Sequence, residues 1–332
     1  MKVTGFGDYM IHFSPAGDAR FMQSDMMQMS FTGAEANVCA ALGFWGEDTA
    51  FVTRLPGHLL AQKGLAFLRS LSIDTRHIPT GEGRMGIYFL EKGSSVRASA
   101  VIYDRTPSAF STSAFEDYDW AAILGQTDVL YISGITPCLS ESLFACCQKA
   151  MIDAKSRGIR VVFDVNYRPA LATPEKLREI FFALAPSISH LIGNEEHLKL
   201  LLQWETPEED PETRLKALAA KAREATGVEN IAITVRRTPS ASDAVVYAAY
   251  RTGEAFALSR RHSIHVTDRV GSGDAFSAGF IYGLLHGFDA RETVEFASAS
   301  NAMKHTIQSD INFASVEEIR SVMAGNRYDV KR

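Results

Sequence analysis

Four short apolar runs lie between residues 129 and 235: Val129-Leu130-Tyr131-Ile132, Arg160-Val161-Val162-Phe163, His190-Leu191-Ile192 and Ile231-Ala232-Ile233-Thr234-Val235. Helix-like stretches accompany them, near 140–157, 174–185, 195–203 and 211–226. Strands that alternate with helices form βαβ units, and such units build a mostly parallel sheet with helices on its faces. Ligands bind to these sheets beyond the carboxyl ends of the strands. The runs therefore predict an α/β domain with its binding site along that edge.

The composition fits one domain over residues 1–332, because 46% of the 332 residues are hydrophobic and can bury a large core. The net charge of −5 favours neither nucleic acid nor an anionic membrane as a partner. Asp8 and His12 interrupt any signal-peptide core, and no run reaches the roughly 18 apolar residues of a membrane span. The four cysteines lack a C-x-x-C pair, which argues against zinc. We expect a cytoplasmic protein.

Residues 84–105 break the alternation of strands and helices. Apolar side chains alternate from Met85 to Phe89, the turn 92–95 follows, and Val101 and Tyr103 continue a second strand, which predicts an antiparallel hairpin. Residues near 11–31 can add short strands to it. We expect a small sheet, formed by approximately 11–31 and 84–108, that serves either as a lid over the substrate or as a flap that forms a dimer.

The segment Asp268-Arg269-Val270-Gly271-Ser272-Gly273-Asp274 carries the chemistry. Two glycines around a serine let the backbone point several N–H groups at one spot, and the following helix adds its positive end, so the segment predicts an anion site. Asp274 would lie beside the anion, ionised at neutral pH, and orient or deprotonate an attacking hydroxyl. The alternative is an ordinary turn in which Asp274 only caps the helix.

Three other segments carry candidate ligand contacts. Gly33-Ala34-Glu35-Ala36-Asn37 opens a helix where Asn37 offers a donor and an acceptor to a polyol, or else is simply a small-residue helix start. Tyr103-Asp104-Arg105 and Asn166-Tyr167-Arg168-Pro169 each carry an arginine. Two arginines that converge on one pocket favour an acidic sugar, whereas each alone is an ordinary surface ion-pair partner.

These residues resemble the PfkB family of ribokinase-like carbohydrate kinases over essentially the whole chain. The family pattern D-[TR]-[TV]-G-[AS]-G-D matches residues 268–274, and G-G-x-x-x-N matches Gly33 and Asn37, with Ala34 at the second glycine. The resemblance implies a three-layer α/β/α fold with a mostly parallel central sheet and a small antiparallel β lid. It also implies that Asp274 is the catalytic base and that Gly271, Ser272 and Gly273 form the anion hole. Gly33 and Asn37 would contact the sugar.

Within the family the chain is similar to 2-keto-3-deoxygluconate kinases, which implies further site residues. The implied sugar-acid contacts are Tyr88, Tyr103, Arg105, Arg168 and Asp310, the last in the stretch 304–312. The implied nucleotide contacts are Asn194, Thr234, Gly271, Gly273, Asn301 and His305, and Glu195 and Glu196 would approach a magnesium ion through water. Two departures stand out. His197 replaces the glutamate of N-x-x-E, and 236–240 reads Arg-Arg-Thr-Pro-Ser where the family commonly has a glycine-containing turn against the nucleotide.

The resemblance implies ATP-dependent phosphorylation of the terminal hydroxyl of 2-keto-3-deoxygluconate to the 6-phosphate. ATP and Mg²⁺ are the expected cofactors, with K⁺ as a further candidate, and a homodimer or higher homo-oligomer through the lid is an expected assembly. The partners are small molecules rather than nucleic acid or a membrane. Two alternatives stay open: a kinase for fructose, another neutral sugar or a nucleoside, and a catalytically silent protein that binds a sugar acid.

Overall fold

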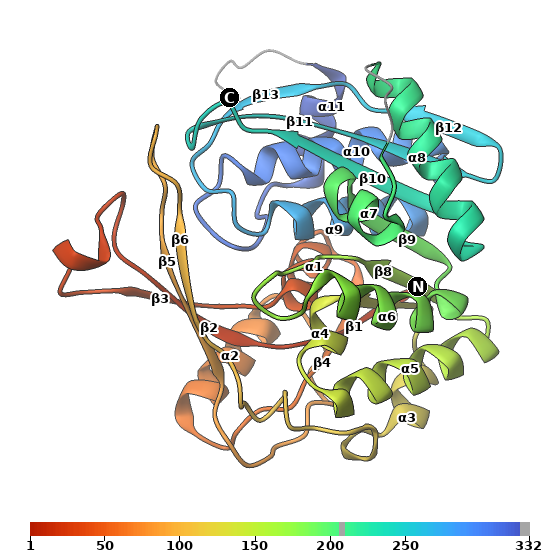
Figure 1. Cartoon of the computed structure of the whole chain (residues 1–332). Coiled ribbons are helices and arrows are strands. Elements are labelled where there is room, and N and C mark those ends of the chain that lie inside the picture. The colour runs from red at the N-terminus through yellow and green to blue at the C-terminus, as the bar shows by residue number, and fades with distance from the viewer. Residues whose placement is uncertain (206–209, 326–332) are drawn as a thin grey trace.

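A nine-stranded sheet runs through the part of the chain that the computed structural model describes, residues 1–205 and 210–325 (Figure 1). Its order is β12-β11-β10-β9-β8-β7-β1-β4, with β13 also paired to β11. The strands are β1 (Lys2–Phe6), β4 (Asp48–Val52), β7 (Val129–Ser133), β8 (Arg160–Asp164), β9 (His190–Asn194), β10 (Asn230–Arg237), β11 (Asp243–Thr252), β12 (Ala255–Leu258) and β13 (His262–His265). Six strands of this sheet pair in parallel: β10, β9, β8, β7, β1 and β4. Strand β11 pairs antiparallel with each of its three neighbours, β10, β12 and β13.

Helices cover both faces of this sheet because successive side chains of a buried parallel strand point to opposite faces. In β7, Leu130 and Ile132 pack with one set of helices, whereas Val129 and Tyr131 pack with the other. The first set is α3 (Trp120–Leu124), α4 (Ile135–Cys138), α5 (Glu141–Ser156), α6 (Pro174–Leu184), α7 (Glu195–Leu202) and α8 (Pro211–Thr226). The second is α1 (Ala34–Phe44), α9 (Ser272–Leu285), α10 (Ala290–Lys304) and α11 (Val316–Ala324). The predicted three-layer α/β/α fold is confirmed.

Local sequence fixes where the predicted helices begin. The side chains of Ser140, Thr173 and Asp210 each accept a hydrogen bond from the first turn of α5, α6 and α8. Pro174 and Pro211 follow two of these caps, where the missing N–H costs nothing. The four predicted helices therefore agree with the observed bounds to within a residue or two.

A four-stranded sheet, which we call the lid, stands beside the large sheet (Figure 1). Its order is β3 (Gln28–Thr32), β2 (Met10–Ser14), β5 (Gly86–Glu91) and β6 (Ala100–Asp104), and α2 (Leu59–Ser70) lies behind it. The predicted small antiparallel sheet is confirmed, and it includes one parallel pair, β2 and β5. Its four strands come from the neighbourhood of 11–31 and 84–108, and the role of these segments as a lid stays a prediction. The chain passes through α1, β4 and α2 between β2 and β5, which gives it room to return in the same direction.

The tip of the lid touches the large sheet. The N–H of Ser95, between β5 and β6, donates to Ser242 Oγ at 2.8 Å, and its carbonyl accepts from the N–H of Ala241 at 2.7 Å. The lid and the β10–β11 connection therefore enclose the space between them. The predicted single domain over 1–332 stays a prediction and includes 206–209 and 326–332, which lie outside the described residues. In the described ranges, no helix is both long and apolar enough to cross a bilayer.

Candidate active site

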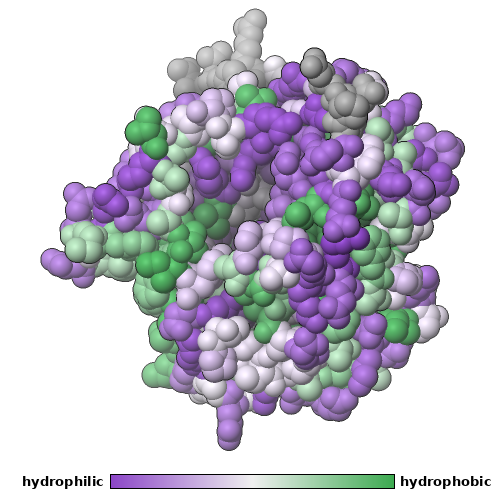
Figure 2. Space-filling view, viewed as in Figure 1, coloured by the Kyte–Doolittle hydropathy of each residue, from purple (hydrophilic) through white to green (hydrophobic). Residues whose placement is uncertain are grey.

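A cavity of about 580 Å³ opens between the lid and the carboxyl ends of β8, β9 and β10. Figure 2 shows the molecule hollowed there, with hydrophilic side chains around the opening. Most of the predicted site residues line this cavity: Gly33, Asn37, Tyr88, Tyr103, Arg105, Arg168, Asn194, Glu195, Glu196, Thr234, Gly271, Ser272, Gly273, Asp274 and Asn301. Asp310 and His305 are fully buried and do not line it. Segments far apart in the sequence therefore meet at the edge that the βαβ pattern predicts.

The predicted anion loop forms the start of α9. Gly271 is the residue before the helix, with φ of +76°, and a Cβ placed there would lie 1.8 Å from the carbonyl oxygen of Asp310. Only glycine fits this position, since it has a left-handed backbone and no free space. The side-chain amide of Asn301, on α10, donates to the carbonyl of Ser272 at 2.7 Å and holds the first turn in place.

Backbone N–H groups of this loop are available to a ligand. The N–H of Ser272 donates to the carbonyl of Arg269 at 3.3 Å. Among the described residues, no acceptor bonds the N–H groups of Gly271, Gly273 or Asp274. Free N–H groups at the N-terminus of a helix attract an anion, because they add hydrogen bonds to the positive end of the helix dipole.

The buried side chain of Lys304 bonds the start of the anion loop. Lys304 has no exposed surface, and its ammonium donates to the carbonyls of Asp268 at 3.3 Å and Ile307 at 3.1 Å. On the lid side, Lys92 Nζ lies 3.5 Å from Asp268 Oδ2. These contacts connect the anion loop to α10 and to the lid.

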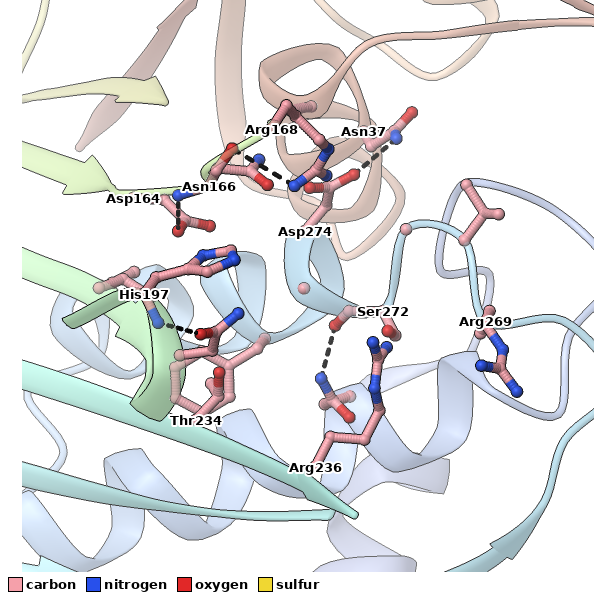
Figure 3. A pocket seen from close by; sticks show the side chains of 18 of the residues that line it. Asn37, Asp164, Asn166, Arg168, His197, Thr234, Arg236, Arg269, Ser272 and Asp274 are labelled. Carbon is pink, nitrogen blue, oxygen red and sulfur yellow. Dashed lines mark hydrogen bonds between the residues drawn. The ribbon is translucent and has the colours of Figure 1, made fainter. Parts of the chain in front are cut away.

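Asp274 projects from the first turn of α9 into the cavity, toward Asn37 and Arg168 (Figure 3). Its carboxylate accepts a hydrogen bond from Asn37 Nδ2 at 2.7 Å (Figure 3). It therefore does not cap the helix, because Gly271 occupies that position. Burial, with a smaller contribution from the negative charge of Asp164, raises the pKa of Asp274 to about 7, and the Asn37 hydrogen bond only partly opposes this. The expectation that Asp274 is ionised at neutral pH needs a correction, because burial outweighs the helix end and leaves the carboxyl group partly protonated there.

The two predicted arginines reach the same cavity but differ in their partners. Arg105 Nε donates to Asp8 at 2.8 Å, and both side chains are buried, so this guanidinium is already neutralised. Arg168 donates only to the carbonyls of Asn166 and Tyr167 among the described residues, and it lies over Asp274 (Figure 3). The cavity therefore presents one uncommitted guanidinium next to the candidate base.

Two tyrosines of the lid complete this side. The Tyr88 hydroxyl donates to the carboxylate of Asp310, and its ring lies 5.9 Å from that of Tyr103, centroid to centroid. Asp310 also lies 3.2 Å from His12 Nδ1. Burial disfavours the charged form of Asp310, but these partners outweigh it and lower the pKa. The position of Asp310 supports a role in holding Tyr88 rather than direct contact with a ligand.

Comparison with known proteins agrees with this geometry. Residues 2–315 match the pfkB family carbohydrate kinases. The chain belongs to this family. It is 27% identical to a 2-dehydro-3-deoxygalactonokinase of Haloferax volcanii over 100% of this chain and 99% of the relative, and 28% identical to a 2-dehydro-3-deoxygluconokinase of Thermoproteus tenax over 93% and 90%. The structure of a 2-dehydro-3-deoxygluconokinase from Thermotoga maritima superimposes with a TM-score of 0.95 at 36% identity, covering 98% of both chains.

The metal site predicted for this pfkB-family kinase needs a correction at Glu195. This buried carboxylate is bonded to Arg214 at 2.7 Å, Lys199 at 3.2 Å and Arg237 at 3.0 Å. Burial opposes its charge, but hydrogen bonds from Arg214 and Lys199 lower its pKa. Three cations already satisfy Glu195, so it is not available to a metal ion.

Two other carboxylates fit a magnesium ion better. Glu196, whose side chain is 70% exposed, and Asp164 both line the cavity. Within residues 1–205 and 210–325, no group of three His, Cys, Asp or Glu side chains is placed to hold a metal. Magnesium usually keeps several waters and takes one or two carboxylates together with substrate phosphates. The donor set of this kinase therefore fits an ion that arrives with a nucleotide.

The predicted nucleotide contacts lie along β9, β10 and α10. Thr234 and Asn301 line the cavity there, and Asn194 lies nearby, where its Oδ1 accepts from the His197 N–H at 2.7 Å and caps α7. His305 Nδ1 bonds the carbonyl of Asn301 at 2.8 Å beneath the cavity surface. The position of His305 thus supports packing behind Asn301 rather than contact with a nucleotide.

The cavity residues that sequence reasoning did not assign to the site include Asp164, His197, Arg236 and Arg269. Asp164 ends a parallel strand, which is a usable signal. His197 and Arg236 were visible only as departures from the family pattern. Burial first, then the charges of Arg168 and Arg236, lowers the pKa of His197 to about 4, so it is neutral at pH 7.

We expect the activity of this kinase to rise with pH up to about 7. Asp274 must be ionised to accept a proton, and kcat/KM for the acceptor reports the pKa of the free enzyme. Below that pKa, kcat/KM should fall by about tenfold per pH unit. A pH profile of initial rates from 5 to 8.5 measures this.

Asp164→Asn provides the matched variant for the profile. Removing the negative charge of Asp164 should lower the pKa of Asp274 and move the acidic limb to lower pH. The isosteric amide can still accept from the Asn166 N–H through its oxygen, and its NH₂ group can donate to Ser277 Oγ, which donates to the second carboxylate oxygen in the wild type. A profile that stays flat from pH 5 to 8 in the wild type would contradict the raised pKa.

Proposed function

We propose that this chain phosphorylates the terminal primary hydroxyl of 2-keto-3-deoxygluconate, also called 2-dehydro-3-deoxygluconate, with ATP as donor and the 6-phosphate as product. The family makes the protein a carbohydrate kinase. The names of the Thermoproteus tenax relative and of the Thermotoga maritima structure support this keto acid, and that of the Haloferax volcanii relative supports its galacto counterpart.

The observation that carries the acid substrate is Arg168. Its guanidinium has no carboxylate partner among the described residues and lies beside Asp274 in the cavity. A guanidinium binds a carboxylate through two parallel hydrogen bonds, which a neutral sugar does not offer. A sugar acid held by Arg168 at one end, with its far hydroxyl near Asp274, satisfies both groups.

The mechanism follows from the groups around the anion loop. The oxygen of the primary hydroxyl bonds the γ-phosphorus, and Asp274 takes the hydroxyl proton. The bond between the γ-phosphorus and the β,γ-bridging oxygen breaks, and its electron pair leaves with ADP. Asn37 fixes the orientation of the carboxylate. The free N–H groups of Gly271, Gly273 and Asp274 bind the charge that develops on the phosphoryl oxygens. Glu196 and Asp164 would hold a magnesium ion, which would neutralise phosphate charge.

The test is an acceptor panel assayed by ADP release with ATP and Mg²⁺. The panel holds 2-keto-3-deoxygluconate, 2-keto-3-deoxygalactonate, fructose, another neutral sugar and a nucleoside. We expect the highest kcat/KM for a keto acid, with ³¹P NMR locating the phosphate on the terminal carbon. A preference for a neutral acceptor would overturn the assignment, and no turnover with any acceptor would favour the silent binding protein.

Arg168→Met should raise KM for the keto acid by about tenfold or more, because a charge-assisted pair with the carboxylate is lost. The KM for a neutral acceptor, where one is accepted, should change little. Arg168→Lys should fall between the two, since lysine keeps the charge but not the planar fork. Equal losses for acidic and neutral acceptors would contradict the role of Arg168 in reading the carboxylate.

Two further expectations accompany the proposal. The outer strand β6 is exposed along its length, and Ile102, Met22 and Met26 are exposed apolar side chains of the lid and its β2–β3 connection. This supports the predicted dimer through the lid, which light scattering of the purified chain tests.

Activation by K⁺ stays a prediction and is tested by replacing K⁺ with choline in the ADP-release assay.

A further inference from the structure

Arg236, near the end of β10, lines the cavity. No carboxylate of the described ranges forms an ion pair with it, and its guanidinium rises from the strand toward Ser272 (Figure 3). Its side chain is exposed at the opening of the cavity. Partial desolvation by the cavity wall, and then the positive charges of Arg269 and Arg168, lower its pKa. The guanidinium groups of Arg236, Arg269 and Arg168 therefore line the same cavity and repel one another when no anion is bound.

The adjacent residue, Arg237, does form an ion pair, because its side chain points to the other face of the sheet. Side chains alternate along β10, so Arg237 points to the face of α7 and α8, where it bonds Glu195 at 3.0 Å. Arg236 points with Thr234 to the opposite face, where α9 and α10 place Ser272 and Asn301. The strand thus commits one arginine to the protein and leaves the other to a ligand.

The acidic side chains near Arg236 do not offset its charge. Glu195 is taken by Arg214, Lys199 and Arg237. Arg269, which follows Asp268 in the anion loop, donates to the carbonyl of Ala241 and forms no ion pair among the described residues. The space between Arg236, Arg269 and the anion loop therefore presents positive charge and N–H donors that suit a ligand with several negative charges.

We propose that Arg236, with Arg269, binds the polyphosphate chain of the donor nucleotide. This inference rests on the proposed kinase function and deepens it. The free N–H groups of Gly271, Gly273 and Asp274 receive the terminal phosphate, and Arg236 lies on the Ser272 side of that loop, away from Asp274 (Figure 3). A guanidinium there contacts the phosphates that remain on the leaving nucleotide.

A polyphosphate fits this position better than the carboxylate of the acceptor. Arg168 already serves the acceptor side next to Asp274, whereas Arg236 is on β10 beside Thr234 and Asn301. The fork of an arginine matches phosphate oxygens bidentately, and Arg236 adds positive charge where the negative charge of ADP grows as the bond to the γ-phosphorus breaks. Arg236 thus acts on the donor, and through it on the departure of ADP.

Binding of a series of nucleotides to Arg236→Met tests the proposal without any acceptor. By isothermal titration calorimetry of the full chain, we expect Kd for ATP and ADP to rise about tenfold or more, because each loses a charge-assisted contact, while adenosine binds as to the wild type. The affinity for ADP should also depend less steeply on salt in the variant. A merely structural role for Arg236 would weaken adenosine as well.

Arg237→Met is the matched control, because Arg237 is the adjacent residue and is committed to Glu195, which keeps Arg214 and Lys199. Its Kd for ADP should change less than about threefold. Arg236→Lys should recover part of the loss. In steady-state assays, Arg236→Met should raise KM for ATP and leave KM for the acceptor unchanged.

Two results would overturn the proposal. One is an unchanged Kd for ATP and ADP in Arg236→Met, and the other is a rise in KM for the acceptor alone, which would assign Arg236 to the carboxylate. Wild-type turnover of the keto acid together with either result would leave the kinase function standing. Failure of the wild type to phosphorylate any acceptor, with Arg236-dependent ADP binding intact, would instead contradict only the proposed reaction.

Discussion

Asp274→Asn is expected to lower kcat by about 10²–10⁴-fold, the range that loss of a general base produces. The carboxylate lies in the cavity, held by Asn37 at 2.7 Å, directly after the free N–H groups of the anion loop. An amide has nearly the same shape and can still accept the hydrogen bond from Asn37, but it cannot take a proton. Single-turnover kinetics with saturating ATP and keto acid measure the loss in the chemical step.

The stability of the Asp274→Asn variant separates lost chemistry from lost folding. The pKa of Asp274 is about 7 in the folded chain, above its value of about 3.9 when unfolded. The folded state therefore binds more protons between these two values, and the wild type loses stability as pH rises through that window. The variant lacks this loss, so its Tm should equal that of the wild type near pH 4 and exceed it at pH 8. A lower Tm at pH 8, or unchanged kcat, would contradict the assigned role.

Gly271→Ala is expected to destroy both the anion loop and much of the stability. The new Cβ would lie 1.8 Å from the carbonyl oxygen of Asp310, and the backbone has φ of +76°, so neither the space nor the conformation suits alanine. We expect kcat/KM to fall about 100-fold or more and the free energy of unfolding to drop by about 2 kcal/mol or more. Thermal unfolding and the ADP-release assay give both quantities.

Gly273→Ala is the matched control for stability. Gly273 lies two residues further along, inside the first turn of α9, and a Cβ there meets no atom within 4 Å. Because alanine is favoured over glycine in a helix by about 1 kcal/mol, its Tm should stay the same or rise. Equal destabilisation by both substitutions would show that the contact with Asp310 does not explain the effect at Gly271.

The order of strands and helices was predictable because it depends on local periodicity. Runs such as 160–163 and 231–235 alternate with helices whose caps, Ser140 and Thr173, are written in the sequence. The lid hairpin was predictable for the same reason. Its parallel pair β2–β5 was not, because strands separated by more than seventy residues pair according to where the intervening elements pack.

The chain of amino acids by itself determined the fold class and the anion loop at 271–274, since strand periodicity and glycine spacing are local signals. The resemblance implied a shared site for Asn37, Arg168 and Asp274, and the tertiary structure places all three in one cavity. Only the tertiary structure decided which charged groups are free. It joined Glu195 to three cations and Arg105 to Asp8, left Arg168 and Arg236 open to the cavity, and raised the pKa of Asp274 to about 7. The physical reason is that ion pairing and burial depend on residues distant in sequence, whose distances are set when the sheet, the helices and the lid pack together.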